Sequence, residues 1–218
     1  MITAFLPCRK GSQRIPDKNI KKFGGIEGGL LSIKLKQLLD CPQIDEVIVS
    51  SNDIRILTFA EKLKNAKLKL DERPEHLGTS DTSTDDLIKY VPSIILEGDV
   101  LWTHVTSPFI CASSYSSFIA QYIESLNNGF DSLMTVKELK GFIWSNDGPL
   151  NYQRETEKWP RTQTVQSLYE IDSGAFISSI ENYNLFEDRI GSKPFKYTQD
   201  DIKSLDIDWP KDFDLAER

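Results

Sequence analysis

The sequence predicts an α/β protein, a three-layer α/β/α sandwich built on a mostly parallel, Rossmann-like sheet. Two observations support this fold class. Short apolar runs typical of buried strands alternate with helical patterns along the chain, and successive runs are separated by enough residues for right-handed crossover helices. The 218 residues, 39% of them hydrophobic and 27% charged, suffice for a single domain over residues 1–218 with a substantial core.

The first part of the chain supplies two strands and two helices. Ile2–Leu6 is an unbroken apolar run, as expected of a buried strand, and the β-branched segment Val47–Val49 predicts a second one. Between them, residues 30–39 form a helix whose apolar residues recur at helical spacing, at Leu31, Leu35, Leu38 and Leu39. Asp53 stands at the N-cap position of another helix over residues 54–63.

The alternation continues through the rest of the chain. A helix over residues 87–96, capped by Thr84 or Asp85, precedes a strand over 99–105 and a helix over 112–126. Further short strands are expected at 132–136, 174–178 and 195–198, and Trp209-Pro210 begins a final helix. Because ligands of such sheets bind at the carboxyl ends of strands, the loops after Leu6, Val49 and Val105 are the expected places for a site.

Residues 137–172 interrupt this regular organisation. They show little periodicity and carry several aromatic residues, among them Phe142, Trp144, Tyr152 and Trp159. We expect this stretch to be an excursion from the sheet that serves as a lid or as a dimerisation arm.

Composition limits the environment and the partners. The formal net charge of -7 argues against nucleic acid, and no apolar run approaches the roughly 20 residues that a membrane helix requires. The amino terminus lacks the pattern of a signal peptide. The three cysteines, Cys8, Cys41 and Cys111, are too few and too scattered for a disulfide framework or a zinc site. A reduced, cytoplasmic protein is the simplest interpretation.

The segment directly after the first strand carries the strongest chemical signal. Four cations surround Gly11 and Ser12 there: Arg9, Lys10, Arg14 and Lys18. A glycine lets the backbone approach an anion, amides donate hydrogen bonds and cations neutralise charge, so the loop is suited to phosphate. It has neither the P-loop spacing nor the GxGxxG fingerprint. The alternative is a set of solvated surface residues beside a turn.

Two carboxylates near the carboxyl terminus form a second candidate site. Asp206 and Asp208 lie two residues apart at the end of a strand-like run over residues 204–207, and such residues point to the same side of an extended segment. Two hard oxygen ligands facing one way suit Mg²⁺, which also takes phosphate and water. The alternative role for Asp208 is to cap the final helix.

Five patches of the chain together resemble the acylneuraminate cytidylyltransferases, also called CMP-sialic acid synthetases. The first is the RxGSxRxPxKN signature of residues 9–19. The others, in the family's order, are Arg73-Pro74 with Ser80 to Ser83 and Asp86; Thr106-Ser107-Pro108; Pro160 to Gln163 with Tyr169 and Gly174-Ala175; and Asp206 to Pro210. The resemblance implies a sheet of the nucleotide-diphospho-sugar transferase type.

The same resemblance implies an activity and assigns roles. CMP passes from CTP to the anomeric hydroxyl of a 2-keto sugar acid, pyrophosphate leaves, and the enzyme is a Mg²⁺-dependent homodimer. The implied catalytic residues are Arg9, Arg14, Lys18 and Asp208, with Mg²⁺ on Asp206 and Asp208. The implied nucleotide-binding residues are Arg9, Gly11, Ser12, Arg14, Lys18, Asn19, Asp81 and His104. The implied contacts to the sugar acid are Thr106, Ser107, Arg161, Gln163 and Tyr169.

Several positions depart from the family pattern and leave alternatives open. Gln13 replaces a lysine, Phe109 replaces an arginine, and His104 replaces a glutamine expected to read cytosine. His104 either takes over base recognition or is a structural histidine, and Asn19 either contacts a ribose or caps its turn. A ketodeoxyoctonate cytidylyltransferase, a sugar-1-phosphate nucleotidyltransferase and a non-catalytic nucleotide-binding protein remain the competing hypotheses.

Overall fold

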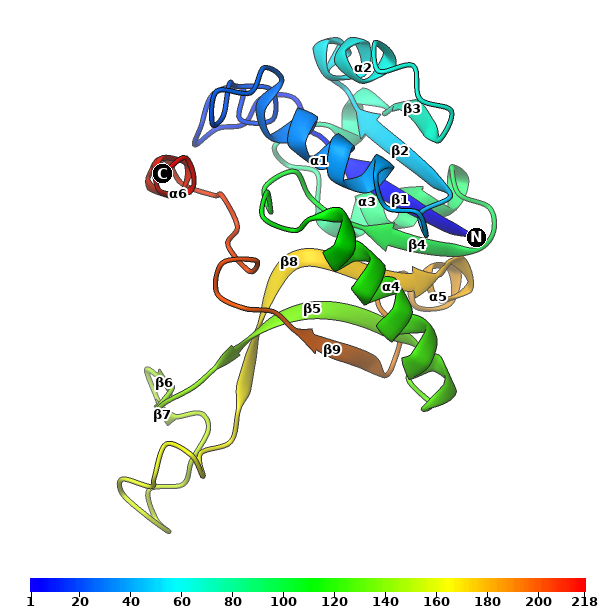
Figure 1. Cartoon of the computed structure of the whole chain (residues 1–218). Coiled ribbons are helices and arrows are strands. Elements are labelled where there is room, and N and C mark those ends of the chain that lie inside the picture. The colour runs from blue at the N-terminus through cyan, green and yellow to red at the C-terminus, as the bar shows by residue number, and fades with distance from the viewer.

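The computed structural model describes residues 1–218 and has a central seven-stranded sheet (Figure 1). The strands lie in the order β3-β2-β1-β4-β8-β5-β9. Their bounds are Ile2–Pro7 (β1), Glu46–Ser51 (β2), Leu68–Glu72 (β3), Asp99–Trp102 (β4), Ser132–Leu139 (β5), Leu168–Ser179 (β8) and Pro194–Thr198 (β9). Strand β8 is antiparallel to both of its neighbours, and every other pair is parallel, which confirms the mostly parallel sheet.

Helices cover both faces of the sheet and complete the predicted three layers. One face carries α1 (Gly29–Leu39), α2 (Ile54–Glu61) and α4 (Ala112–Asn127), and Phe213 of α6 (Pro210–Ala216) joins the same core. The other face carries α3 (Thr84–Tyr90), the short 3-10 turn η2 (Val91–Ser93) and α5 (Ile180–Phe186). Alternation along β1 divides the two cores, because Ala4 and Leu6 face the first set and Phe5 faces the second.

Several local expectations were wrong or incomplete. Strand β3 and helix α5 were missed, because Leu68 and Leu70 are the only apolar residues of β3 and α5 is short. The cap of α3 is Ser83, whose hydroxyl accepts the Asp86 amide, rather than Thr84 or Asp85. No strand forms over residues 204–207, which are turn and irregular structure. The final helix is capped at Trp209, not Asp208, because the Asp212 carboxylate accepts the amides of both residues.

The order of the strands creates a topological switch between β1 and β4. After β1 the chain moves outward through β2 and β3 and then returns to pair β4 with the opposite edge of β1. The loops at the carboxyl ends of β1 and β4 therefore diverge to opposite sides and leave a crevice between them. Tertiary structure thus selects the loops after β1 and β4 from the three that the sequence indicated.

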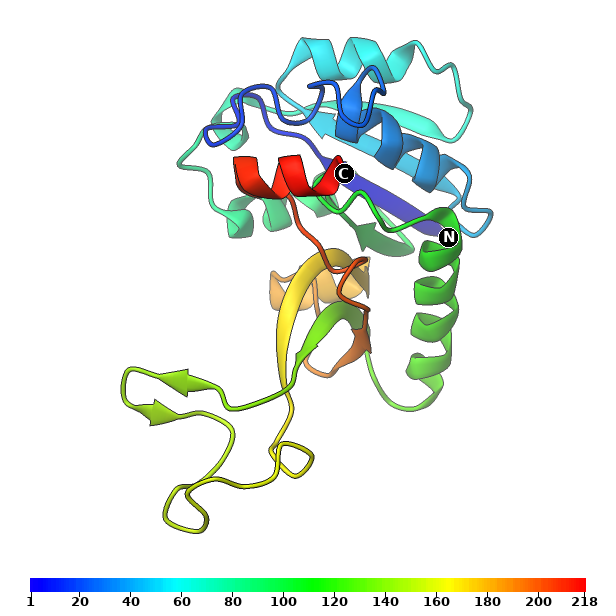
Figure 2. The same cartoon turned by 60° about the vertical axis from the view of Figure 1, so that its left-hand side comes forward.

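Residues 140–167 leave the sheet as an arm between the ends of β5 and β8 (Figures 1 and 2). The arm contains a small hairpin of β6 (Trp144–Ser145) and β7 (Gly148–Pro149). Buried Asn151 fastens its base, donating to the carbonyls of Gly141 and Gln166 and accepting the Ile143 amide.

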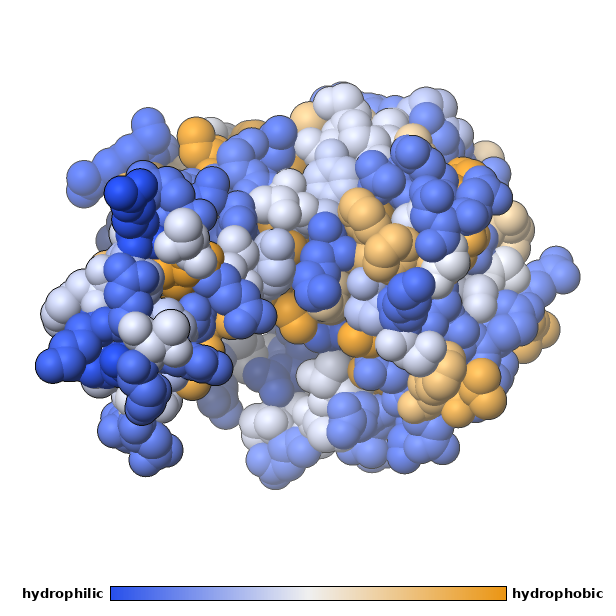
Figure 3. Space-filling model, turned by 90° about the horizontal axis from the view of Figure 1, so that it is seen from below, coloured by the Kyte–Doolittle hydropathy of each residue, from blue (hydrophilic) through white to orange (hydrophobic).

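The arm also holds an aromatic cluster on its outer part. The Phe142 ring lies 5.2 Å from Tyr152 and 5.6 Å from Trp159, and the Arg154 guanidinium lies over both Trp144 and Trp159. Trp159 is 64% exposed, and most of the surface seen from below is hydrophilic, with hydrophobic residues in small separate groups (Figure 3). No helix in the structure combines the length and the apolar character needed to cross a membrane.

Candidate active site

A polar cleft of about 490 Å³ lies at the switch point of the sheet. The loop after β1 forms one wall, the loop after β4 together with residues just before α6 forms a second, and the segment between β3 and α3 forms the far wall. The predicted site residues that line it are Arg9, Ser12, Arg14, Lys18, Asn19, His104, Thr106, Asp206 and Asp208. The fold therefore brings the basic loop, the end of β4 and the late carboxylates into one cavity.

The basic loop is held in shape by bonds at both of its ends. The Asn19 amide group donates to the Arg9 carbonyl at 3.1 Å, so this side chain closes the loop on itself. Arg9 in turn donates to the Thr79 carbonyl at 3.0 Å and ties the loop to the far wall. Gly11 adopts a φ of +75°, a conformation that side chains other than glycine rarely accept.

The loop is also packed tightly against the start of α1. The Leu31 amide donates to the Asn19 carbonyl at 2.8 Å. Gly29 has a positive φ, and a Cβ atom there would lie 1.8 Å from the Lys21 carbonyl oxygen. Only glycine allows the helix and the loop to approach this closely.

Asp206 and Asp208 line the same cleft but have different surroundings. Asp206 is half-buried, and its Oδ1 atom is sealed from solvent without a hydrogen-bond partner. Burial raises the pKa of Asp206, and the charge of Asp208 adds to this effect. The Asp208 carboxylate is half-exposed and lies 3.0 Å from Arg14 Nη1 and 3.5 Å from Lys18 Nζ.

These two aspartates fit a divalent cation by their donor chemistry. An orphaned, buried carboxylate oxygen is costly unless a cation reaches it, and a second carboxylate faces the same cleft. The chain groups no three histidine, cysteine or acidic side chains that could hold a metal by themselves. A pair of hard oxygen ligands that leaves the remaining positions to phosphate and water is the arrangement that suits Mg²⁺.

His104 faces the cleft from the loop that follows β4. Its Nε2 atom accepts a hydrogen bond from the buried Trp102 indole at 2.5 Å. Burial lowers the pKa of His104 to about 3, with further lowering by the charges of Arg189 and Lys34. The imidazole is therefore neutral near physiological pH and is not a proton donor to a leaving group.

A buried lysine supports this loop from behind. Lys34 of α1 is fully buried and donates to the Ser107 carbonyl at 2.7 Å and the Tyr115 hydroxyl at 2.6 Å. The Tyr115 hydroxyl also contacts Thr103, which lies directly after β4. Burial lowers the pKa of Lys34 to about 7. This network fixes residues 103–107, which present His104 and Thr106 to the cleft.

The far wall consists mainly of residues for which no functional role was predicted. They are Arg73, Leu77, Thr79, Thr82, Ser83, Thr84 and Leu87, from the segment between β3 and α3. Arg73 is buried and donates to both the hydroxyl and the carbonyl of Ser50, so it joins this wall to the end of β2. Arg73, Thr82 and Ser83 belong to a patch that carries the family resemblance, so the sequence marked this segment although no role was predicted for these residues.

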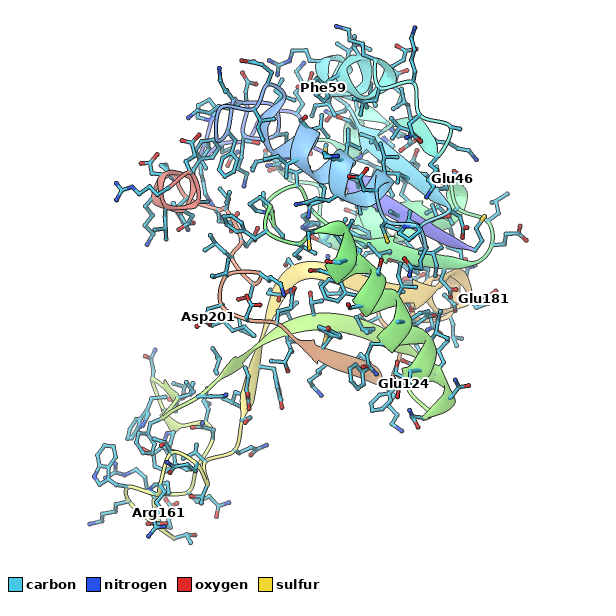
Figure 4. All side chains as sticks on the ribbon, viewed as in Figure 1. Glu46, Phe59, Glu124, Arg161, Glu181 and Asp201 are labelled. Atoms are coloured by element: carbon cyan, nitrogen blue, oxygen red, sulfur yellow. The ribbon has the colours of Figure 1, made fainter.

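Other predicted site residues do not line the cleft of this chain. Gly11 borders a smaller cavity beside it, Asp81 is exposed outside it, and Ser107 is buried with its carbonyl bound to Lys34. Tyr169 lies 43% exposed on β8. Arg161 stands near the outer end of the arm, well away from the cleft, and Gln163 belongs to the same segment (Figure 4).

A cationic cleft with paired carboxylates, at the switch point of a mostly parallel sheet, defines the class of α/β proteins that bind nucleotides at this edge. The chain belongs to the cytidylyltransferase family, whose profile matches residues 3–218. This assignment agrees with the resemblance found in the sequence.

Curated relatives are similar to the chain at modest identity. It is 25% identical over 224 residues to an N-acylneuraminate cytidylyltransferase of Escherichia coli O18:K1:H7, which covers 99% of this chain and 51% of the relative. The chain thus spans about half the length of that protein. It is 27% identical over 193 residues to a pseudaminic acid cytidylyltransferase of Campylobacter jejuni, which covers 85% of this chain and 81% of the relative.

Solved structures share the fold. A 4-diphosphocytidyl-2C-methyl-D-erythritol synthase from Anaerococcus prevotii superposes with a TM-score of 0.67 at 16% identity, over 99% of this chain and 94% of that one. A CMP:2-keto-3-deoxy-manno-octonic acid synthetase complexed with CTP gives 0.68 at 13% identity, over 99% and 96%. At these identities the likeness concerns the architecture alone.

Proposed function

We propose that this protein transfers CMP from CTP to the anomeric hydroxyl of a sialic acid-like 2-keto sugar acid and releases pyrophosphate. The observation that carries the proposal is the meeting of Arg14 and Lys18 with Asp208 in one cleft, at 3.0 and 3.5 Å. Family membership supports transfer from CTP, and the names of the two relatives support an acidic nine-carbon sugar as acceptor.

The basic loop binds the triphosphate in this proposal. Arg9, Arg14 and Lys18 neutralise the phosphates and stabilise the charge that develops on departing pyrophosphate. Ser12 and the open backbone at Gly11 supply hydrogen-bond donors next to them. Lys18 is 14% exposed and is held by the Ile207 carbonyl at 2.7 Å, so its ammonium group is positioned before a ligand arrives.

Asp206 and Asp208 are the residues that would hold Mg²⁺. The ion, when bound, supplies Lewis-acid polarisation of the phosphate oxygens. The anomeric oxygen attacks the α-phosphorus, the bond between that phosphorus and the bridging oxygen breaks, and pyrophosphate leaves with the bond electrons. Asp208 is the candidate acceptor of the hydroxyl proton, because His104 already spends its acceptor nitrogen on Trp102.

The acceptor sugar lies between Thr106 and the arm of a second protomer. Arg161, Gln163 and Tyr169 do not line the cleft of their own chain, whereas an arm that projects from the body can reach a neighbour. Arg161 then pairs with the sugar carboxylate through its forked guanidinium. The exposed aromatic cluster of the arm supplies apolar contact area for a homodimer.

The proposal is tested by incubating the protein with Mg²⁺, each of CTP, UTP, GTP and ATP, and a panel of acids. The acids are N-acetylneuraminic, legionaminic, pseudaminic and 3-deoxy-manno-octulosonic acid. We expect pyrophosphate release only with CTP and a nine-carbon acid, a CMP-sugar by mass spectrometry, and loss of the reaction in excess chelator. Preference for the eight-carbon acid or another nucleotide would assign one of the related activities, and no turnover with any pair would contradict the proposal.

A further inference from the structure

The two ring nitrogens of His104 have unequal surroundings. The Trp102 indole N–H points to Nε2 at 2.5 Å, and an indole nitrogen can only donate. Nε2 must therefore carry the lone pair, which leaves the ring proton on Nδ1. Nδ1 has no partner within the chain and is not sealed from solvent, and His104 lines the cleft.

The donor that fixes this tautomer is itself immobilised. Trp102 is 1% exposed and lies in a cross-strand row with Phe5 of β1 and Phe176 of β8. Its ring meets Phe5 edge-on at 4.9 Å between centroids. The Arg189 guanidinium lies 3.7 Å from the Phe176 ring centroid and 5.4 Å from that of Trp102, and it covers the row.

Arg189 also disfavours a second proton on the imidazole. Arg189 is half-buried, and its Nη1 atom is sealed from solvent without a hydrogen-bond partner. A positive charge behind Trp102 opposes formation of imidazolium, in the same direction as burial. The imidazole therefore presents one function to the cleft, a neutral N–H donor.

We propose that Trp102 and Arg189 are positioning residues that hold His104 as a neutral imidazole protonated on Nδ1, and that this N–H selects a hydrogen-bond acceptor on a substrate. The acceptor is a carbonyl oxygen, ring nitrogen or carboxylate oxygen, and both the cytosine ring and a sugar acid carry such atoms. A substrate that places an amino group here would set its own N–H against the Nδ1–H of His104, and two donors cannot form a hydrogen bond with each other. The selection step rests on the proposed function, whereas the tautomer does not.

The tautomer is tested on the free protein by ¹⁵N-histidine NMR. The chain has only two histidines, and exposed His76 provides the reference, with His76→Asn completing the assignment. We expect one His104 tautomer, protonated on Nδ1, in the wild type and a mixture in Trp102→Phe, which keeps the aromatic row but loses the N–H. An Nε2-protonated ring or an imidazolium in the wild type overturns the proposal, whether or not the protein turns over CTP.

The selection step is tested with two further variants. The side-chain amide of His104→Asn can replace the Nδ1 donor, whereas His104→Leu cannot. We expect His104→Leu to weaken the binding of one substrate about tenfold, which is the cost of one hydrogen bond. The affinity of His104→Asn for the same substrate should remain within about threefold of wild type. If only the affinity for Mg²⁺-CTP falls in His104→Leu, the contact belongs to the nucleotide. If only the KM for the sugar acid rises, the contact belongs to the sugar. Equal behaviour of the two variants overturns the selection step.

A circular dichroism melt shows whether Trp102→Phe is folded. If it is not, Arg189→Met tests the positioning of His104 independently. Arg189→Met removes the charge but retains an apolar chain over Phe176 and Trp102. We expect a higher pKa for His104 in this variant by the same NMR experiment. An unchanged titration contradicts the role given to Arg189.

Discussion

The carboxylate of Asp208 lies 3.0 Å from the guanidinium of Arg14, so the two ends of the chain meet across the cleft. Lys18 lies 3.5 Å from the same carboxylate, and the Trp209 ring stacks under Arg14 with 4.4 Å between the ring centroid and Cζ. In the free protein Asp208 compensates part of the positive charge of these two cations. In the proposed function Asp208 would bind Mg²⁺ and the two cations would bind the triphosphate, so the binding of the two ligands would be coupled through this ion pair.

Replacement of Asp208 by alanine should separate turnover from nucleotide binding. We expect turnover to fall at least about a hundredfold, because one of the two metal carboxylates is lost. CTP binding without Mg²⁺ should be unchanged or tighter, because Arg14 and Lys18 are freed and a negative charge is removed. Initial rates and calorimetric titration with CTP in chelator measure the two effects. Near-normal turnover would remove Asp208 from the metal site.

Replacement of Arg14 by alanine should weaken CTP binding. The lost charge-assisted hydrogen bonds predict a rise of about tenfold to a hundredfold in the KM for CTP. Lys22→Ala is the matched control, because Lys22 is an exposed cation of the same region that pairs with Glu27 outside the cleft. Equal saturation curves for Arg14→Ala and the control would separate the loop from the phosphate site.

Gly29→Ala should be strongly destabilising. A methyl group there would lie 1.8 Å from the Lys21 carbonyl oxygen, on a residue with a φ of +51°. Strain and overpacking together predict a loss of about 2 to 5 kcal/mol in the free energy of unfolding, measured by urea titration. Gly141→Ala serves as a control, because its φ is also positive but nothing lies within 4 Å of the added atom. A similar loss in both variants would show that contact with the loop is unimportant.

His104 should make the protein less stable as the pH falls. Its pKa is lowered from 6.5 to about 3 in the folded state, so the unfolded chain binds more protons between these values. The contribution of this residue is therefore complete above pH 6.5 and is lost as the pH falls towards 3. Urea unfolding at several pH values should show a steeper decline for the wild type than for His104→Asn, which does not titrate. Parallel declines would mean that the imidazole is protonated freely in the folded protein.

Removal of the arm should abolish both dimer formation and turnover of the sugar acid. We expect a variant with residues 143–166 replaced by a short glycine-serine linker to be monomeric by light scattering and to lose turnover of the sugar acid. Mg²⁺-CTP binding should persist, because no arm residue lines the cleft. A dimeric variant, or a monomer with normal turnover, would contradict the role of the arm.

Local pattern was enough to predict most of the fold. Apolar runs such as Ile2–Leu6 and the leucines of α1 depend on burial alone, and burial is encoded in residue type and spacing. The Asp53 cap was predictable for the same reason, since it bonds within two residues of itself. Strand β3 and helix α5 were not, because β3 depends on its pairing with β2 and α5 is too short to show a clear helical pattern.

The sequence alone predicted an α/β sheet, which the structure confirms, together with a basic loop suited to phosphate and an aspartate pair suited to a metal ion, which stay predictions. Only the tertiary structure decided which groups meet, because the switch between β1 and β4 opens the cleft and the return of the chain before α6 brings Asp208 to Arg14. It also decided the chemical state of His104, which is set by Trp102 beside it and by Arg189, far away in sequence. Contacts between distant residues depend on the path of the whole chain, and no local pattern encodes them.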